Sequence, residues 1–106
     1  MVSFEEFKKL ELKIAEIESV LPHPNADKLY VLNIRIGDVR KQLVAGIRPF
    51  YQEEELKGKK IVVVDNLAPA MIRGVESQGM LLAASQGDQL ALVVPEKPMP
   101  DGAVVR

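Results

Sequence analysis

The sequence predicts a single, nearly all-β domain with two short helices. Its 106 residues contain no internal repeat and no linker long enough to divide them, which favours one domain. Several segments alternate apolar and polar residues or form β-branched runs, and turn-forming residues separate them, as in "LYVLNIRIGD" (29–38). Apolar residues make up 47% and charged residues 27%, the balance of an ordinary globular domain.

The chain opens with a short helix over residues 4–10. Ser3 followed by Glu6 forms a capping box, which satisfies backbone N–H groups at a helix start. Phe4, Phe7 and Leu10 then share one face of the helix, and this apolar face needs a surface to cover it.

Five strands are expected after this helix, with a helical link between the third and the fourth. Residues 11–22 alternate, but the apolar positions change from even to odd, with Leu21 among the inward ones, which indicates a bulge. Gly37 and Asp38 turn the second strand into the third, and Pro49 and Gly58 bound the helical link. The expected ranges are 11–22, 29–38 and 40–47 for the first three strands, 49–58 for the link, and 59–67 and 79–85 for the last two strands. A sixth extended segment (90–95) and a proline-rich tail follow.

Three strands, a helical link and two further strands follow the element order of a five-stranded OB-fold barrel. A bent first strand suits that fold, because closing a small barrel requires coiled strands. An SH3-like barrel is the competing fold, and the helix between the third and fourth strands favours the OB-fold.

The charge distribution points to an anionic partner, although the net charge of −1 by itself argues against nucleic acid. Residues 28–48 carry five basic residues and one acid, a local charge of +4 in a nearly neutral chain. A phosphate backbone responds to such a local field within a Debye length of roughly 10 Å. The basic residues of this stretch are Lys28, Arg35, Arg40, Lys41 and Arg48.

Catalysis is not expected, because the residue inventory lacks its usual groups. His23 is the only histidine and there is no cysteine, so neither a hydrolytic triad nor a zinc site is indicated. His23 precedes a proline and is expected to be a partly exposed turn residue. No glycine-rich phosphate-binding motif is present, and no cofactor is expected. The absence of cysteine, the short apolar runs and the acidic N-terminus favour a cytoplasmic protein without a membrane segment.

Residues 66–78 show neither strand nor helix periodicity and are expected to form a long polar loop. Asn66, Arg73, Ser77 and Gln78 offer amide, guanidinium and hydroxyl groups suited to phosphate and ribose, and Gly74 and Gly79 would allow close backbone approach. Aromatic residues for base stacking are scarce, so folded RNA is a better ligand than single strands. Met80 opens an apolar run, which by pattern places it in the core.

Four motifs together resemble one family: "FEEFKKLELKIAEI", "HPNADKLYVL", "QLVAGI" and "NLAPAMIRGVESQGMLLAAS". The chain resembles the tRNA-binding domain of methionyl-tRNA synthetases, shared with endothelial monocyte-activating polypeptide-like and structure-specific tRNA-binding proteins. The resemblance implies an OB-fold that binds tRNA by shape, at the outer corner of the L, in support of the synthetase. The free-standing length is similar to that of a separate synthetase β subunit.

The resemblance also implies contact residues and a homodimer. It assigns Ser77 and Met80 of "SQGM" to the tRNA surface, which moves Met80 from the core to the rim. Ala70 departs from the pattern, since many relatives carry lysine there. The full set of expected tRNA-contacting residues is Asn25, Lys28, Arg40, Lys41, Arg48, Asn66, Arg73, Ser77, Gln78 and Met80. Dimer contacts are expected from the N-terminal helix (1–10) and the C-terminal extension (91–106).

Two other functions remain open. A dimeric OB-fold export chaperone that binds unfolded polypeptide has a similar plan, but it resembles "HPNADKLY" and "RGVESQGMLLAAS" less well. An assembly domain that tethers a synthetase to its partners is the third possibility.

Overall fold

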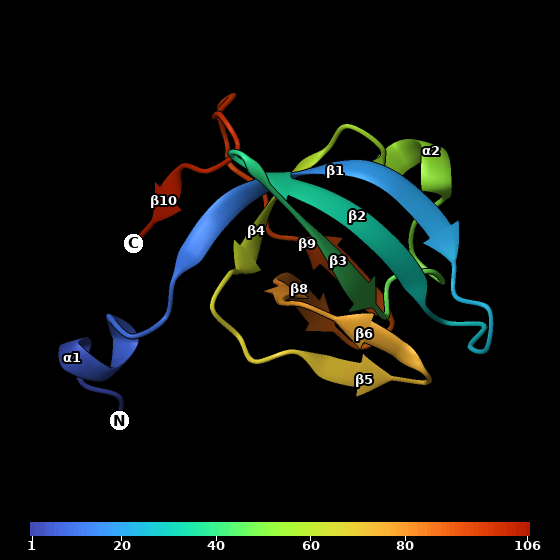
Figure 1. Cartoon of the computed structure of the whole chain (residues 1–106), viewed down its shortest axis with the longest axis horizontal. Coiled ribbons are helices and arrows are strands. Elements are labelled where there is room, and N and C mark those ends of the chain that lie inside the picture. The colour runs from blue at the N-terminus through green and yellow to red at the C-terminus, as the bar shows by residue number, and fades with distance from the viewer.

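The computed structural model describes all 106 residues and is nearly all β (Figure 1). Its helices are single turns, and one strand, β1, is much longer than the rest. The elements in chain order are α1 (Phe4–Phe7), β1 (Leu12–Pro22), β2 (Tyr30–Ile36), β3 (Val39–Ala45), α2 (Glu53–Leu56), β4 (Lys60–Val64), β5 (Ala70–Ile72), β6 (Val75–Ser77), β7 (Met80–Leu81), β8 (Ala83–Gln86), β9 (Gln89–Leu92) and β10 (Val104–Val105).

The main sheet has the strand order β3-β2-β1-β4-β7, all antiparallel, and it curls on itself as a barrel wall. The single-turn helix α2 lies between β3 and β4, so the predicted fold class is confirmed. β1 can serve both halves of the barrel because it pairs with β4 near its start and with β2 near its end.

A bulge in β1 lies between Ile17 and Ser19, where the register against β2 shifts. The predicted bulge is therefore confirmed, but the inward residue beyond it is Val20, which is buried, while Leu21 is 56% exposed. The extra residue of a bulge moves the following side chains to the opposite face, and the sequence pattern placed this change too early.

The core lies inside the curled sheet. Alternate residues of β2, from Tyr30 to Ile36, face inward as predicted, and β-branched side chains of β4 meet them. Leu56 of α2 is fully buried and belongs to the same core cluster. The largest side chains without solvent exposure are Ile17, Leu32, Ile34, Leu43, Leu56, Ile61 and Val63.

Side chains, rather than a strand ladder, close the barrel between β3 and the segment that precedes β7. Ser77 Oγ accepts a hydrogen bond from the Val44 N–H (3.0 Å) and donates one to the Gly79 carbonyl (3.0 Å). Gln78 pairs twice with Gln42, through its own N–H and through its Oε1, each at 2.8 Å. Backbone N–H and C=O groups at the edge of β3 thereby find hydrogen-bond partners without a continuous neighbouring strand.

Three sequence expectations need correction in this half of the chain. The segment 66–78 is not an unstructured loop, because β5 and β6 form a hairpin within it. The expected strand 79–85 is split into β7, which pairs with β4, and β8, which pairs with β9. The helical link begins at Glu53 with Gln52 as its cap, and not at Pro49. Each of these short elements depends on tertiary partners that the local pattern does not encode.

The two ends of the chain meet at the start of β1. β10 pairs with Leu12 and Lys13, along the edge of β1 that β2 leaves uncovered. The capping box of α1 is confirmed, although the helix ends at Phe7, three residues earlier than expected. α1 itself extends away from the barrel, and none of its residues is buried (Figure 1).

Candidate nucleic-acid interface

Two loops at one end of the barrel are joined through His23. The first is residues 23–29, between β1 and β2, and the second is the β5–β6 hairpin. Nδ1 of His23 accepts the Asn25 backbone N–H (2.9 Å), so the ring proton lies on Nε2, which donates to the Ile72 carbonyl (3.0 Å). His23 is only 3% exposed, which corrects the expectation of a partly exposed turn residue.

Arg73 occupies the tip of the β5–β6 hairpin. Ile72 pairs with Val75, so Arg73 and Gly74 form a two-residue turn, with φ of 53° and 89°. Positive φ at both positions is the geometry of a type I′ turn, which glycine adopts easily and arginine does not. Contacts with Asn25 support this conformation: the Arg73 guanidinium donates to the Asn25 carbonyl (3.2 Å), and the Asn25 amide donates to the Arg73 carbonyl (3.4 Å).

A group of cations surrounds the 23–29 loop without acidic partners. Lys28 is exposed within the loop, Arg73 reaches it from the hairpin, and Arg48 donates to the Ala26 carbonyl (3.4 Å). The Arg48 guanidinium also lies over the Tyr30 ring, 6.0 Å from its centroid. None of the three cations forms an ion pair, and Asp27 is the one acid of the loop. We call Asn25, Lys28, Arg48 and Arg73 the loop surface.

A shallow groove of about 400 Å³ runs across the loop surface. It is lined by Asn25, Ala26, Asp27, Lys28, Leu29 and Arg73. The strand 2–3 face and the two loops at this end are the regions through which OB-fold barrels bind oligonucleotides. Guanidinium, ammonium and amide groups at the rim of an open groove suit phosphate oxygens and ribose hydroxyls.

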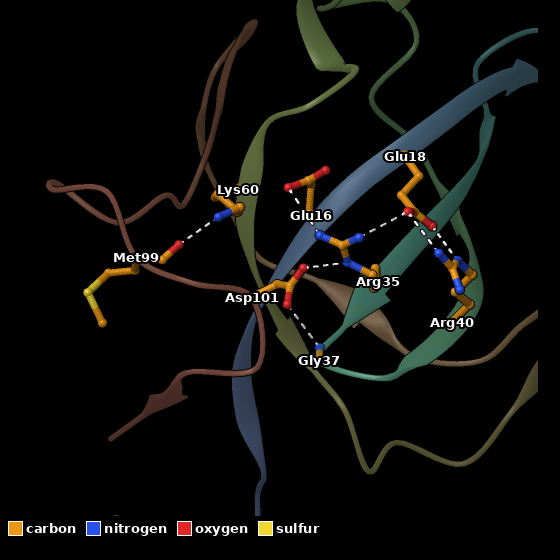
Figure 2. Close-up of polar contacts among 8 residues, drawn as sticks. All are labelled: Glu16, Glu18, Arg35, Gly37, Arg40, Lys60, Met99 and Asp101. Carbon is orange, nitrogen blue, oxygen red and sulfur yellow. Dashed lines mark hydrogen bonds and ion pairs between the residues drawn. The ribbon is translucent and has the colours of Figure 1, made fainter.

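The cations of the β2–β3 hairpin are differently placed, because acids surround them (Figure 2). Arg35 pairs with Asp101 of the tail at 2.8 Å and lies within 3.8 Å of both Glu16 and Glu18. Arg40 pairs with Glu18 at 2.8 Å. The hydrogen bond from Arg35 to Asp101 is the main reason why the pKa of Arg35 is raised and that of Asp101 is lowered from their usual values.

Lys41 is also paired, with Asp65 at the end of β4. Its Nζ donates to the Asp65 carboxylate (2.7 Å), and Lys13 Nζ reaches the second carboxylate oxygen (2.9 Å). Burial opposes ionisation of Asp65, but the hydrogen bonds from the two lysines outweigh it and lower the pKa of the carboxyl. Lys41 and Arg40 therefore contribute less positive field to a ligand than their sequence positions indicated.

Three of the expected contact residues of the 66–78 segment have internal partners. Asn66 ties the N-terminal segment to the barrel, since its side chain accepts the Glu11 N–H and donates to the Lys9 carbonyl. Ser77 is 3% exposed, and it and Gln78 close the barrel against β3. The structure brings Asn25, Lys28, Arg48 and Arg73 together and leaves these three side chains committed elsewhere.

Met80 is 47% exposed at the start of β7, so the pattern-based expectation of core burial is wrong. The residue before it, Gly79, approaches the protein's own backbone: a Cβ added there would lie 2.9 Å from the Val64 carbonyl oxygen. The tight contact at Gly79 leaves no room for a side chain at the point where the chain enters β7.

Sequence reasoning missed the role of His23. The signal available was its position two residues before Asn25 in a turn, which allows a side-chain acceptor for the Asn25 N–H. Its second partner, Ile72, is 49 residues away, and no local pattern could identify it.

No group of three or more histidine, cysteine, aspartate or glutamate side chains is arranged to hold a metal ion. No helix is long and apolar enough to cross a membrane.

The curled sheet and its element order are those of a small OB-type barrel, a fold that hosts many nucleic-acid-binding proteins. A family profile described as a putative tRNA-binding domain matches residues 12–104, and the chain belongs to that family. The chain is 51% identical over 105 residues to the methionine–tRNA ligase of Thermococcus kodakarensis, covering 99% of this chain and 14% of the enzyme. It is 45% identical over 106 residues to that of Nanoarchaeum equitans, again spanning 14% of the relative.

Solved structures show the same fold. A methionyl-tRNA-synthetase-related protein from Pyrococcus horikoshii superimposes with a TM-score of 0.93 at 34% identity, over 100% of this chain and 98% of the other. The CsaA chaperone protein of Picrophilus torridus superimposes with a TM-score of 0.91 at 31% identity, over 100% of both chains. One of these neighbours is described as synthetase-related and the other as a chaperone, so the shared fold by itself does not assign a function to this chain.

Proposed function

We propose that this domain binds tRNA by shape, with little sequence preference, and supports a methionyl-tRNA synthetase by capturing tRNA at the outer corner of the L. The observation that carries the proposal is the loop surface, where three cations without acidic partners come from three separate segments. Phosphate contacts position a nucleic acid and do not read its bases.

Geometry favours folded RNA over a single strand. The loop surface offers guanidinium, ammonium and amide groups, and the neighbouring Tyr30 ring is buried, with the Arg48 guanidinium over it. Single-strand binding depends on exposed aromatic rings that stack with successive bases, whereas folded RNA is recognised through phosphates and 2′-hydroxyls. Met80, which is half exposed, is proposed to add an apolar contact to a sugar or base.

The test is a filter-binding titration with several unrelated tRNAs over a salt series. We expect similar affinities for all of them, weakening steeply as salt rises, because counterion release accompanies each phosphate contact. A single-stranded RNA of equal length is the control and should bind more weakly. Absence of tRNA retention at low salt would refute the proposal.

The second candidate function is that of a chaperone for unfolded polypeptide, favoured by the likeness to the Picrophilus CsaA chaperone protein. Suppression of aggregation of a denatured substrate protein, with little salt dependence, would support it. The two candidates differ in their response to salt, since tRNA binding should weaken steeply and suppression of aggregation should change little, so a salt series separates them.

We also propose that the domain is a homodimer. Phe4, Phe7 and Leu10 are 70%, 39% and 49% exposed, and they line an apolar groove of about 430 Å³ together with Val104 and Val105 of β10. A second copy that covers this groove would bury the helix face, in agreement with the contacts proposed for residues 1–10 and 91–106. Sedimentation that shows a stable monomer at micromolar concentration would contradict it.

Association with a methionyl-tRNA synthetase, and hence a cytoplasmic location, completes the proposal. It is supported by the 51% identity to a segment of the Thermococcus enzyme. Cosedimentation of the domain with the synthetase of its own organism, in the presence and absence of tRNA, would test it. No complex under either condition would contradict it.

A further inference from the structure

We infer that His23 is a positioning residue for the loop surface, because it couples the 23–29 loop to the β5–β6 hairpin and so holds Arg73 toward the ligand. The inference rests on the proposed function and assigns a specific task to a residue outside the loop surface. His23 does not touch the ligand in this scheme, since only 3% of it is exposed. It acts through the two loops that it joins.

The β5–β6 hairpin needs such an anchor. Its two strands have three residues each and form a sheet of their own, separate from the main sheet. An isolated two-stranded hairpin is marginally stable in water. Ser77 and Gln78 attach its C-terminal end to β3, but the tip lies at the far end of the hairpin. Near the tip, the hairpin is attached to the 23–29 loop by the contacts of Arg73 with Asn25 and by the hydrogen bond from His23 to Ile72, the residue before Arg73.

The conformation of Arg73 makes that anchor important. A non-glycine residue with φ of 53° lies in a sparsely populated region, which is strained and persists only where surrounding contacts enforce it. The bond from His23 holds the carbonyl directly before this strained residue. The mutual bonds of Arg73 and Asn25 are longer, at 3.2 and 3.4 Å, and are exposed to solvent. Only the 3.2 Å bond involves the guanidinium, and it requires that the two loops keep their relative position.

His23 can hold both loops at once because its two ring nitrogens have different tasks. Nδ1, without a proton, accepts from Asn25 in its own loop, and Nε2–H donates to Ile72 in the other. The amide residues imitate these nitrogens one at a time: an asparagine side chain reaches the Nδ1 position and a glutamine side chain the Nε2 position. His23→Asn can therefore keep only the bond to Asn25 within the loop, and His23→Gln can keep only the bond to Ile72 between the loops.

The experiment compares His23→Gln, His23→Asn, Arg73→Ala and the double variant His23→Asn/Arg73→Ala in tRNA titrations over a salt series. We expect His23→Gln to bind nearly as the unchanged protein does, because it keeps the bond between the loops. His23→Asn should bind about tenfold more weakly at 0.1 M salt, and its salt slope should fall by about 1, as expected for one lost phosphate contact and as for Arg73→Ala. The double variant should bind no more weakly than Arg73→Ala, because both changes remove the same contact.

A folded His23→Asn variant with the salt slope of the unchanged protein would overturn the inference. Additive losses in the double variant would do the same. If the unchanged protein fails to bind tRNA, the proposed function falls and the inference falls with it, whereas the other two outcomes refute the inference alone. Should His23→Asn not fold, ¹⁵N NMR of the His23 ring in the unchanged protein decides: the inference requires the proton on Nε2, and a proton on Nδ1 refutes it.

Discussion

Basic residues gather in two regions of the protein, and acids compensate their charge at the β2–β3 hairpin but not around the 23–29 loop. At the β2–β3 hairpin, Arg35 and Arg40 face Glu16, Glu18 and Asp101, and their charge is compensated within the protein (Figure 2). Around the 23–29 loop, Arg48 of the same stretch and Arg73 of the β5–β6 hairpin donate hydrogen bonds to backbone carbonyls, and Lys28 is exposed. A carbonyl orients a guanidinium without cancelling its charge, so the second region keeps a field for an anionic ligand.

The local charge of a sequence segment overstates the positive field that a ligand meets, because some of its cations are paired within the protein. The sum of +4 over residues 28–48 indicated a cationic region, but three of its five cations, Arg35, Arg40 and Lys41, pair with acids of the protein itself. Tail residue Asp101 contributes one of the compensating charges although it lies 66 residues from Arg35.

The largest expected effect comes from neutralising the unpaired region. The variant Lys28→Ala/Arg48→Ala/Arg73→Ala should bind tRNA on the order of 1,000-fold more weakly at 0.1 M salt, because each of the three lost phosphate contacts costs about tenfold there. Its salt slope should fall by about 3. The matched control removes the same charge from another part of the surface, in Lys57→Ala/Lys59→Ala/Lys97→Ala. Equal losses in the two triple variants would mean that net charge alone drives binding.

The next effect concerns the paired cations Lys13 and Lys41. Asp65→Asn should lower the free energy of unfolding by about 1–3 kcal/mol, because it weakens two hydrogen bonds to charged groups. The folded-state pKa of Asp65 is lowered, so its contribution is present at neutral pH and is lost as pH falls through that pKa, below 3.8. Urea titrations at pH 7 and at pH 3 should therefore show a difference between variant and unchanged protein that shrinks in acid. A constant difference would contradict this account.

A comparable loss of stability, without an electrostatic change, is expected from Ser77→Ala. Its hydroxyl is the partner of the buried Val44 N–H, and an unsatisfied buried group costs about 1–3 kcal/mol. Denaturant titration should show the loss, while the salt slope of tRNA binding stays unchanged, because Ser77 carries no charge and is buried. A stable Ser77→Ala variant with a reduced slope would instead return Ser77 to the contact surface.

The smallest effect is expected at Arg40. Although it is 68% exposed, its pairing with Glu18 means that Arg40→Ala should weaken tRNA binding only about twofold. Glu18→Gln makes the complementary test, since it releases Arg40 and should raise affinity slightly at low salt. A loss for Arg40→Ala as large as for Arg73→Ala would remove the distinction between the two regions.

Much of the fold was predictable, because strand periodicity and capping are local. The alternation of β2, its turn at Gly37, the bulge in β1 and the Ser3 capping box all followed from neighbouring residues. The β5–β6 hairpin was missed because its strands are too short to show a period, and its Arg73–Gly74 turn lacks the usual asparagine or aspartate at the first position.

For the site, the sequence by itself determined the chemical groups that are available: cations and amides in two loops, one histidine, few aromatic rings and no cysteine. Those groups favour phosphate binding, and they argue against a hydrolytic triad, a zinc site and base stacking on aromatic rings. Tertiary structure alone decided which cations stay uncompensated, that Ser77 and Gln78 close the barrel, and that His23 joins two loops. The reason is physical: a charge or hydrogen-bonding group acts on whatever lies within a few ångströms, and in this fold those neighbours are mostly 20 to 60 residues distant in the chain.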